Sequence, residues 1–147
     1  MTEQPIHAGL IARYTSRGWQ GVLITGPSGS GKSDLALRAL EQGFSLVSDD
    51  RTRLWLSGGR LYGACPAPIA GLIEARGVGI ATAATRPFAE IRLVARCVIG
   101  AEIPERLPQA RRERLLGLAI PALDLRPLEA SAPAKLIHAL SLLGARP

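Results

Sequence analysis

The sequence predicts an α/β fold in which a mixed sheet containing an antiparallel hairpin is flanked by few helices. Three observations predict it: a glycine-bounded apolar run at 21–25, helical spacing of apolar residues over 33–42, and two β-rich segments joined by Ser57-Gly58-Gly59. A strand followed by a helix and a second strand is typical of α/β folds, whereas a Gly-Gly turn joins antiparallel strands. The length of 147 residues suits one domain with its own core, and we expect residues 1–147 to form a single domain.

The first unit of the fold is expected between residues 21 and 48. Gly21 to Thr25 has the apolar, β-rich composition of a strand buried on both faces. A helix is predicted from Ser33 to Gln42, with Gly43 at the position of a left-handed cap. Its apolar stripe consists of Leu35, Ala36, Ala39 and Leu40. Phe44 to Ser48 is the next strand, so this unit predicts the start of a parallel sheet.

The middle of the chain is predicted to be antiparallel. Arg53 to Leu56 and Arg60 to Tyr62 form the two strands of a hairpin, because the glycines between them supply the positive φ angles of a tight turn. Glu90 to Ile99 is a strong strand candidate. Its alternation places Ile91, Leu93, Ala95 and Cys97 on one face.

The last third of the chain gives weaker signals. Ala119 to Leu125 reads as a strand that Pro121 interrupts. The proline- and arginine-rich stretch at 104–114 predicts an exposed loop with room for one helical turn. Ala134 to Leu143 predicts a short amphipathic helix.

Composition narrows the class of protein. No run approaches the roughly 20 apolar residues that span a bilayer, so we expect a cytoplasmic protein with no membrane partner. Cys65 and Cys97 have neither Cys-x-x-Cys nor metal-ligand spacing and are expected to be small buried apolar residues. The net charge of +6 indicates an anionic partner. Scattered arginines and 4% aromatic residues favour an acidic protein over nucleic acid.

One segment carries a specific motif between the first strand and its helix. The residues Gly26, Pro27, Ser28, Gly29, Ser30, Gly31, Lys32 and Ser33 fit the pattern G-x-x-x-x-G-K-[ST] in its required context. Backbone N–H groups of such a loop surround phosphate oxygens at a helix N-terminus, the lysine binds the β- and γ-phosphates, and the serine hydroxyl binds Mg²⁺. The chain has only two lysines, and one of them is Lys32. This motif predicts binding of ATP with Mg²⁺.

Paired carboxylates follow the second strand. Asp49 and Asp50 stand at its carboxyl end, where open α/β sheets place ligand-binding groups. One of them can bind Mg²⁺ and the other can deprotonate an attacking hydroxyl. Two further features are ambiguous on their own: Glu74 and Arg76 fit a salt bridge beside a glycine-rich turn, and a single His7 near an N-terminal strand fits a packed or surface residue.

These residues together resemble the C-terminal catalytic domain of HPr kinase/phosphorylase. The resemblance covers about residues 7–80, and two segments carry it: the run from Gly21 through the motif to Asp50, and Glu74-Ala75-Arg76-Gly77-Val78-Gly79-Ile80. It implies a P-loop nucleotide-binding fold of the HPr kinase and PEP carboxykinase type. It also implies ATP- and Mg²⁺-dependent phosphorylation of a serine on an HPr-like phosphocarrier of a phosphotransferase system, and assembly as a homo-oligomer, a hexamer in this family.

The resemblance also implies roles for single residues. Asp49 would take the seryl proton with support from His7, while Ser33, Asp50 and Glu74 would hold magnesium. Lys32 would take part in catalysis, and Arg76 would belong to the nucleotide-binding residues. The order of the two aspartates is left open, because both stand at the same strand end.

Some family features have no counterpart here. Pro121 to Pro133 lacks the family's Pro-Gly-Arg-Asn loop, Thr82 stands where an aspartate is expected, and His7 lies further upstream of the motif than expected. Kinase activity is therefore better supported than phosphorolysis. The chain resembles a short form without the family's N-terminal domain, so we expect no metabolite control through that domain. The alternatives are a P-loop kinase for a small metabolite and a nucleotide-binding regulator without transfer activity.

Overall fold

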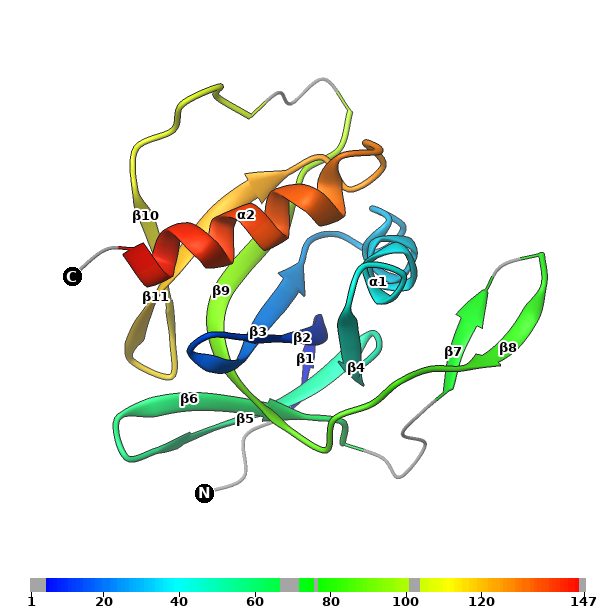
Figure 1. The fold of residues 1–147 in the computed structure, drawn as a ribbon, viewed down its shortest axis with the longest axis horizontal. Helices are drawn as coiled ribbons and strands as arrows, with labels where there is room; N and C mark the ends of the chain where they lie inside the picture. The colour runs from blue at the N-terminus through cyan, green and yellow to red at the C-terminus, as the bar shows by residue number, and fades with distance from the viewer. Residues whose placement is uncertain (1–4, 67–71, 76, 101–103, 146–147) are drawn as a thin grey trace.

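The described residues form a nine-stranded mixed sheet with two helices and a separate two-stranded hairpin, here in a computed structural model (Figure 1). The structure describes residues 5–66, 72–75, 77–100 and 104–145. Its elements are β1 (Ile6–His7), β2 (Gly9–Thr15), β3 (Gly18–Thr25), α1 (Lys32–Leu40), β4 (Phe44–Ser48), β5 (Arg51–Ser57), β6 (Arg60–Ala64), β7 (Leu72–Ala75), β8 (Gly79–Thr82), β9 (Ala89–Cys97), β10 (Arg111–Leu115), β11 (Leu118–Leu125) and α2 (Ala132–Ala145).

The large sheet divides at β9. Its strand order is β1-β5-β6-β9-β3-β2-β4, and β11 also pairs with β9 and carries β10 on its other edge. β9 pairs antiparallel with β6 at its start, and parallel with β3 and β11 further along. Since β3, β9 and β11 run parallel, their carboxyl ends meet at one edge, where such sheets bind ligands.

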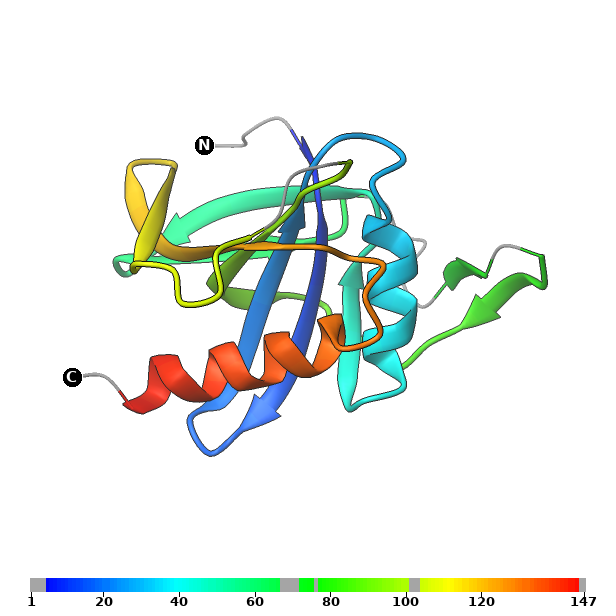
Figure 2. The same ribbon diagram turned by 90° about the horizontal axis from the view of Figure 1, so that it is seen from above.

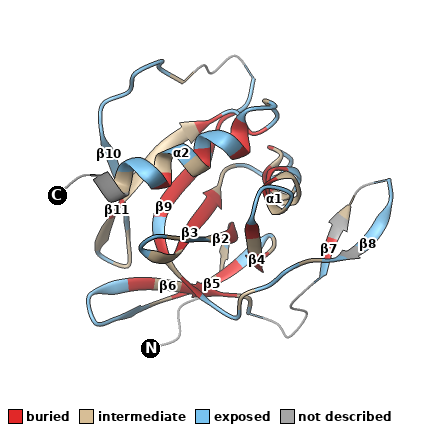
Figure 3. Cartoon of the chain, in the orientation of Figure 1, coloured by how far each residue is buried: buried red, intermediate tan, exposed pale blue. Residues whose placement is uncertain are grey.

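Apolar residues form two clusters on the two sides of this sheet. The first joins α1 and α2 to the strands, with Leu35, Leu136 and Leu140 against Ile24 and Leu93. The second contains no helix residue and lies between the β5–β6 hairpin and the strands β2 and β3. Figure 1 shows the consequence, with both helices above the β5–β6 hairpin, and Figure 2 shows α1 to the right of the sheet and the turn of this hairpin to its left. The buried residues concentrate on β3, β4 and β9, as Figure 3 shows.

The structure confirms the α/β class and the mixed sheet, and it corrects the first parallel pair. β3 and β4 are not neighbours, because β2 lies between them and pairs antiparallel with both. The two strands therefore run in the same direction with one strand between them. The predicted hairpin is confirmed, with Gly58 and Gly59 at φ 58° and 76°.

Three further predictions need correction. The predicted loop at 104–114 ends in a strand: Arg111–Leu115 forms β10 and pairs with β11. Pro121 does not interrupt β11, because its partner is Arg112 of β10 and the pairing with β9 starts only at Ala122. Ile91 does not share the face of Leu93: a register shift in the β3–β9 pairing separates them, and Ile91 joins the second cluster.

The helices are close to their predicted ranges. α1 buries Leu35, Ala36 and Ala39 as expected, and α2 is longer than predicted at both ends. In the described part of the chain, neither helix is long and apolar enough to cross a bilayer.

Candidate active site

The phosphate-loop motif forms a tight turn between β3 and α1. Three glycines of the loop have positive φ angles, which are unfavourable for residues with a Cβ atom: 139° at Gly26, 76° at Gly29 and 102° at Gly31. Gly31 is the N-cap of α1 and makes no side-chain capping hydrogen bond. The first N–H groups of α1 therefore point out of the helix without a side-chain acceptor at this cap, at the positive end of the helix dipole.

The loop packs closely on the ends of β9 and β11. A Cβ atom on Gly26 would lie 2.8 Å from the carbonyl oxygen of Cys97, the last residue of β9. A Cβ atom on Gly31 would lie 3.1 Å from Leu128, just beyond β11. These glycines allow the backbone to approach its neighbours, so the loop rests on the sheet edge where the three parallel strands end.

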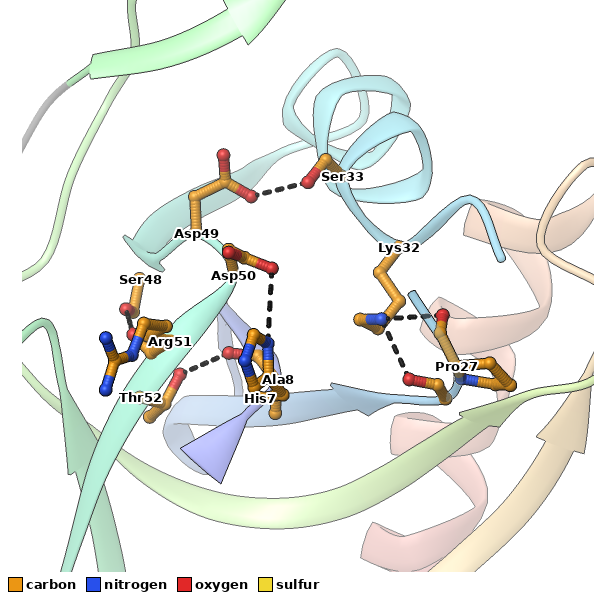
Figure 4. A network of polar contacts seen from close by, with 11 residues as sticks. His7, Ala8, Pro27, Lys32, Ser33, Ser48, Asp49, Asp50, Arg51 and Thr52 are labelled. Carbon is orange, nitrogen blue, oxygen red and sulfur yellow. Dashed lines mark hydrogen bonds and ion pairs between the residues drawn. The ribbon is translucent and has the colours of Figure 1, made fainter. Parts of the chain in front are cut away.

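Lys32 reaches back across the loop. Its side chain is buried, and Nζ donates hydrogen bonds to the carbonyl oxygens of Gly26 at 2.8 Å and Pro27 at 2.9 Å (Figure 4). The ammonium thus lies inside the curve of the loop, where the phosphates would bind. Burial raises the pKa of the Cys97 thiol beneath the loop to about 11, and the charge of Lys32 offsets part of that rise.

Ser30 provides a second polar group in the loop. Its hydroxyl is buried and has no hydrogen-bond partner among the described residues. Buried hydroxyl groups are normally paired, so this one is available to a ligand.

Ser33 and Asp49 are in direct contact. The Ser33 Oγ donates a hydrogen bond of 2.9 Å to Oδ1 of Asp49, which joins the first turn of α1 to the end of β4 (Figure 4). A serine hydroxyl and a carboxylate are the oxygen ligands that Mg²⁺ prefers. This contact is the sharpest geometric feature of the site.

Asp50 points in another direction. Its φ of 70° is unusual for a residue other than glycine, and it turns the side chain towards His7, whose Nδ1 lies 3.8 Å from Oδ1 (Figure 4). Both side chains are mostly exposed, at 70% for His7 and 62% for Asp50. An exposed carboxylate beside a phosphate loop can meet a hydroxyl from an incoming substrate.

The turn that presents Asp50 is fixed by neighbouring backbone contacts. The N–H of Arg51 donates to the carbonyl of Asp49 at 2.8 Å, and the Ser48 hydroxyl donates to the carbonyl of Arg51. Thr52 is fully buried and its hydroxyl donates to the carbonyl of Ala8 at 2.7 Å, while β1 pairs His7 with Arg51. Thr52 was not singled out from the sequence, because a threonine within a strand gives no distinguishing signal.

The remaining predicted residues can be placed only in part. Glu74 belongs to β7 and pairs with Ile80 in the β7–β8 hairpin, while its side chain is outside what the structure describes. Arg76 lies outside the described residues. Within those residues no group of three or more His, Cys, Asp or Glu side chains could hold a metal ion.

Comparison with known proteins identifies the family. The family model for the HPr Serine kinase C-terminal domain matches residues 2–139. The chain belongs to this family. It is 38% identical over 117 residues to the HPr kinase/phosphorylase of Azoarcus sp. (strain BH72), covering 71% of this chain and 37% of that protein.

The chain is also similar to other members of the HPr serine kinase family. The HPr kinase/phosphorylase of Clostridium botulinum (strain Eklund 17B / Type B) is 45% identical over 60 residues, which cover 41% of this chain and 20% of that relative. The chain thus spans between a fifth and two-fifths of these curated relatives. The solved structure of the Hpr(Ser) kinase/phosphatase from Coxiella burnetii matches with a TM-score of 0.77 and 28% identity, covering 95% of this chain and 99% of that one.

Proposed function

We propose that this domain transfers the γ-phosphoryl group of ATP to a serine of an HPr-like phosphocarrier protein of a phosphotransferase system. The observation that carries the proposal is the Ser33–Asp49 contact at 2.9 Å, next to an exposed Asp50, at the end of a phosphate loop. Membership of the HPr serine kinase family supports the acceptor. A regulator that only bound nucleotide would have no use for the second carboxylate.

The loop fits the phosphates of ATP. The N-terminus of α1 is free of a side-chain cap, Ser30 offers a buried hydroxyl without a partner, and the Lys32 ammonium lies within the loop. Each of these groups donates hydrogen bonds or positive charge, as phosphate oxygens require.

The Ser33 hydroxyl and the Asp49 carboxylate fit Mg²⁺. They already meet at hydrogen-bonding distance, so both can bind one ion together with phosphate oxygens. When bound, Mg²⁺ would neutralise charge that develops on the transferred phosphoryl group. Glu74 is the third candidate ligand by resemblance to the family.

The contacts favour Asp50 as the base and Asp49 as the metal ligand, the reverse of the assignment that comes first from the resemblance. Asp49 faces Ser33, whereas Asp50 is exposed and faces His7. In the proposed step the seryl oxygen attacks the γ-phosphorus, its proton passes to the Asp50 carboxylate, and ADP leaves. His7 positions Asp50 for this transfer.

The proposal also covers the oligomeric state of the protein and the compartment in which it acts. By resemblance to the family we expect a homo-oligomer, a hexamer, acting in the cytoplasm and without a nucleic-acid partner. The forward kinase reaction is proposed, because the stretch 121–133 lacks the family's Pro-Gly-Arg-Asn loop.

The test is a transfer assay scored by intact mass. The purified chain is incubated with Mg-ATP and purified HPr, beside Asp49→Asn and Asp50→Asn variants. We expect one phosphoryl group on an HPr serine with the wild type. Asp50→Asn should lower kcat by about 10² to 10⁴ with ATP affinity retained, because it removes the base.

The Asp49→Asn variant separates the two carboxylates. It should raise the Mg²⁺ concentration needed for half-maximal rate, whereas Asp50→Asn should leave that concentration unchanged. The reverse pattern would return the base to Asp49. ATP binding by the wild type without transfer to HPr would refute the proposed function.

A further inference from the structure

A basic aromatic face lies on the side of the molecule opposite the helices. We give this name to the outward side chains Arg53, Trp55, Arg60, Tyr62, Phe88 and Arg92, which come from β5, β6 and the region around the start of β9. Their strand neighbours Leu54, Leu61 and Ile91 point inward into the second core cluster. Figures 1 and 2 agree that the turn of this hairpin is remote from α1 and α2.

The aromatic residues of this face form one cluster. Trp55 stacks beside Tyr62, its direct partner across the strands, with ring centroids 5.9 Å apart. Phe88 closes the triangle at 6.3 Å from Trp55 and 6.1 Å from Tyr62, and it is 47% exposed. The chain has only six aromatic residues, so half of them gather on one partly exposed surface.

Arginines surround this cluster. The Arg53 guanidinium lies over the Trp55 ring, 4.9 Å from its centroid. Arg60 and Arg92 both approach the Glu90 carboxylate, at 3.7 and 3.2 Å. Arg51 begins the same strand, so these four arginines and one glutamate together carry a net charge of +3.

The face continues to the phosphoryl-transfer site. Arg51 directly follows Asp50 and is exposed, and Trp55 lies four residues along β5, about 13 Å away at about 3.3 Å per residue. A protein–protein interface of ordinary size covers about 800 Å² on each partner. A bound protein can therefore contact Trp55 while its hydroxyl reaches Asp50.

We propose that the basic aromatic face docks an acidic surface of the protein substrate, an inference that rests on the proposed kinase function. Trp, Tyr and Arg are the residue types that contribute most at protein interfaces, and the positive charge calls for acidic side chains. A second copy would set two faces of the same charge against each other. Nucleic acid is disfavoured because Tyr62 and Arg53 already contact the Trp55 ring on which a base would stack.

The experiment measures steady-state phosphorylation of purified HPr by the full chain and by Arg53→Glu, Arg92→Glu and Trp55→Ala. Each should raise KM for HPr about 10-fold or more, while kcat and KM for ATP stay within about 2-fold. For the wild type, KM should also rise between 50 and about 300 mM salt, and less so for the charge reversals. Arg112→Glu on β10 makes the same charge change elsewhere and should leave KM for HPr unchanged. Melting curves verify folding of each variant.

The outcomes separate the two proposals. A wild-type chain that phosphorylates HPr, with unchanged KM in all three variants, would overturn the docking face alone. An equal rise in KM for Arg112→Glu, a changed oligomeric mass in the variants, or binding of an oligonucleotide to the face that HPr does not displace would also overturn it. A wild type that phosphorylates no HPr would refute the kinase function and the docking inference with it.

Discussion

At Gly26 the backbone of the phosphate loop passes too close to β9 for any side chain. Its φ is 139°, and a Cβ atom would lie 2.8 Å from the Cys97 carbonyl oxygen and 3.0 Å from its Cβ. Gly26→Ala must therefore strain the backbone and displace the loop. We expect it to lower the free energy of unfolding by about 3 kcal/mol and to abolish binding of a fluorescent ATP analogue. Thermal melting and fluorescence titration measure the two effects.

Gly29 is the matched control for this prediction. It shares the loop and has a positive φ of 76°, but a Cβ atom there would meet nothing within 4 Å. Gly29→Ala should cost only about 1 kcal/mol of stability, for the left-handed backbone alone. Equal losses in the two variants would show that backbone conformation, and not the contact with β9, controls the loop.

The sequence predicted that Ser33, Asp49 and Asp50 belong to one site, but not which side chain each aspartate faces. A motif in which neighbours along the chain share one ligand, as in Lys32 and Ser33, can be identified from spacing alone. Asp49 and Asp50 are also adjacent, yet they face different partners because Asp50 has a left-handed φ and β1 brings His7 beside it. Neither the left-handed φ of Asp50 nor the position of His7 can be predicted from the neighbouring residues.

Among the elements, the strands β9, β10 and β11 are joined by hydrogen bonds to the carboxylate of Asp124. Asp124 accepts two hydrogen bonds from Arg96, at 2.8 and 2.9 Å, and two from Arg111, at 2.9 and 3.1 Å. These guanidinium groups, Arg96 foremost, lower the pKa of Asp124 from 3.8 to about 2. A carboxylate whose pKa is lowered by folding stabilises the folded state at every pH above the pKa it has in the unfolded chain. That contribution is lost as the pH falls from about 4 towards 2.

We expect Asp124→Asn to lower stability at pH 7 by about 1 kcal/mol, after allowance for solvent screening. Wild type and variant should converge in stability as the pH falls from 4 to 2. Urea unfolding across this pH range measures both. Asp34→Asn is the control, because Asp34 pairs only with Arg38 on the surface of α1 in the contacts described. A constant difference between wild type and Asp124→Asn down to pH 2 would contradict the lowered pKa.

The prediction of elements failed where pairing, not composition, decides the structure. Arg111 to Leu115 is charged and follows a proline-rich stretch, so nothing local indicates a strand; β10 forms because β11 offers it an edge. Similarly, the strand, helix and strand at 21–48 gave the correct direction of β3 and β4. They could not reveal β2 between them, because that strand comes earlier in the chain.

For the whole molecule, the labelling rate of the Cys97 thiol measures how often the loop and β9 separate, and whether nucleotide binding opposes that separation. It is 2% exposed at the end of β9 beneath Gly26, and burial raises its thiol pKa to about 11, so the reactive thiolate is scarce near neutral pH. In a Cys65→Ser variant, where Cys97 is the single thiol, a disulfide reagent should react only when the loop and β9 separate. Half-buried Cys65, isolated by Cys97→Ser, should react much faster.

Mg-ATP should then slow the labelling of Cys97. A ligand that binds only the closed molecule stabilises it by about 2.7 kcal/mol at 100 times its Kd, which corresponds to about 100-fold slower labelling where opening is at equilibrium. The rate is followed by absorbance of the released thiolate. Cys65 should show no comparable protection, because it directly follows β6, which pairs with β5 and with the start of β9 and not with its end beneath the loop. Labelling of Cys97 at an unchanged rate under saturating Mg-ATP would mean that the nucleotide does not hold the loop against β9. The phosphate-binding role of this edge of the sheet would then be wrong.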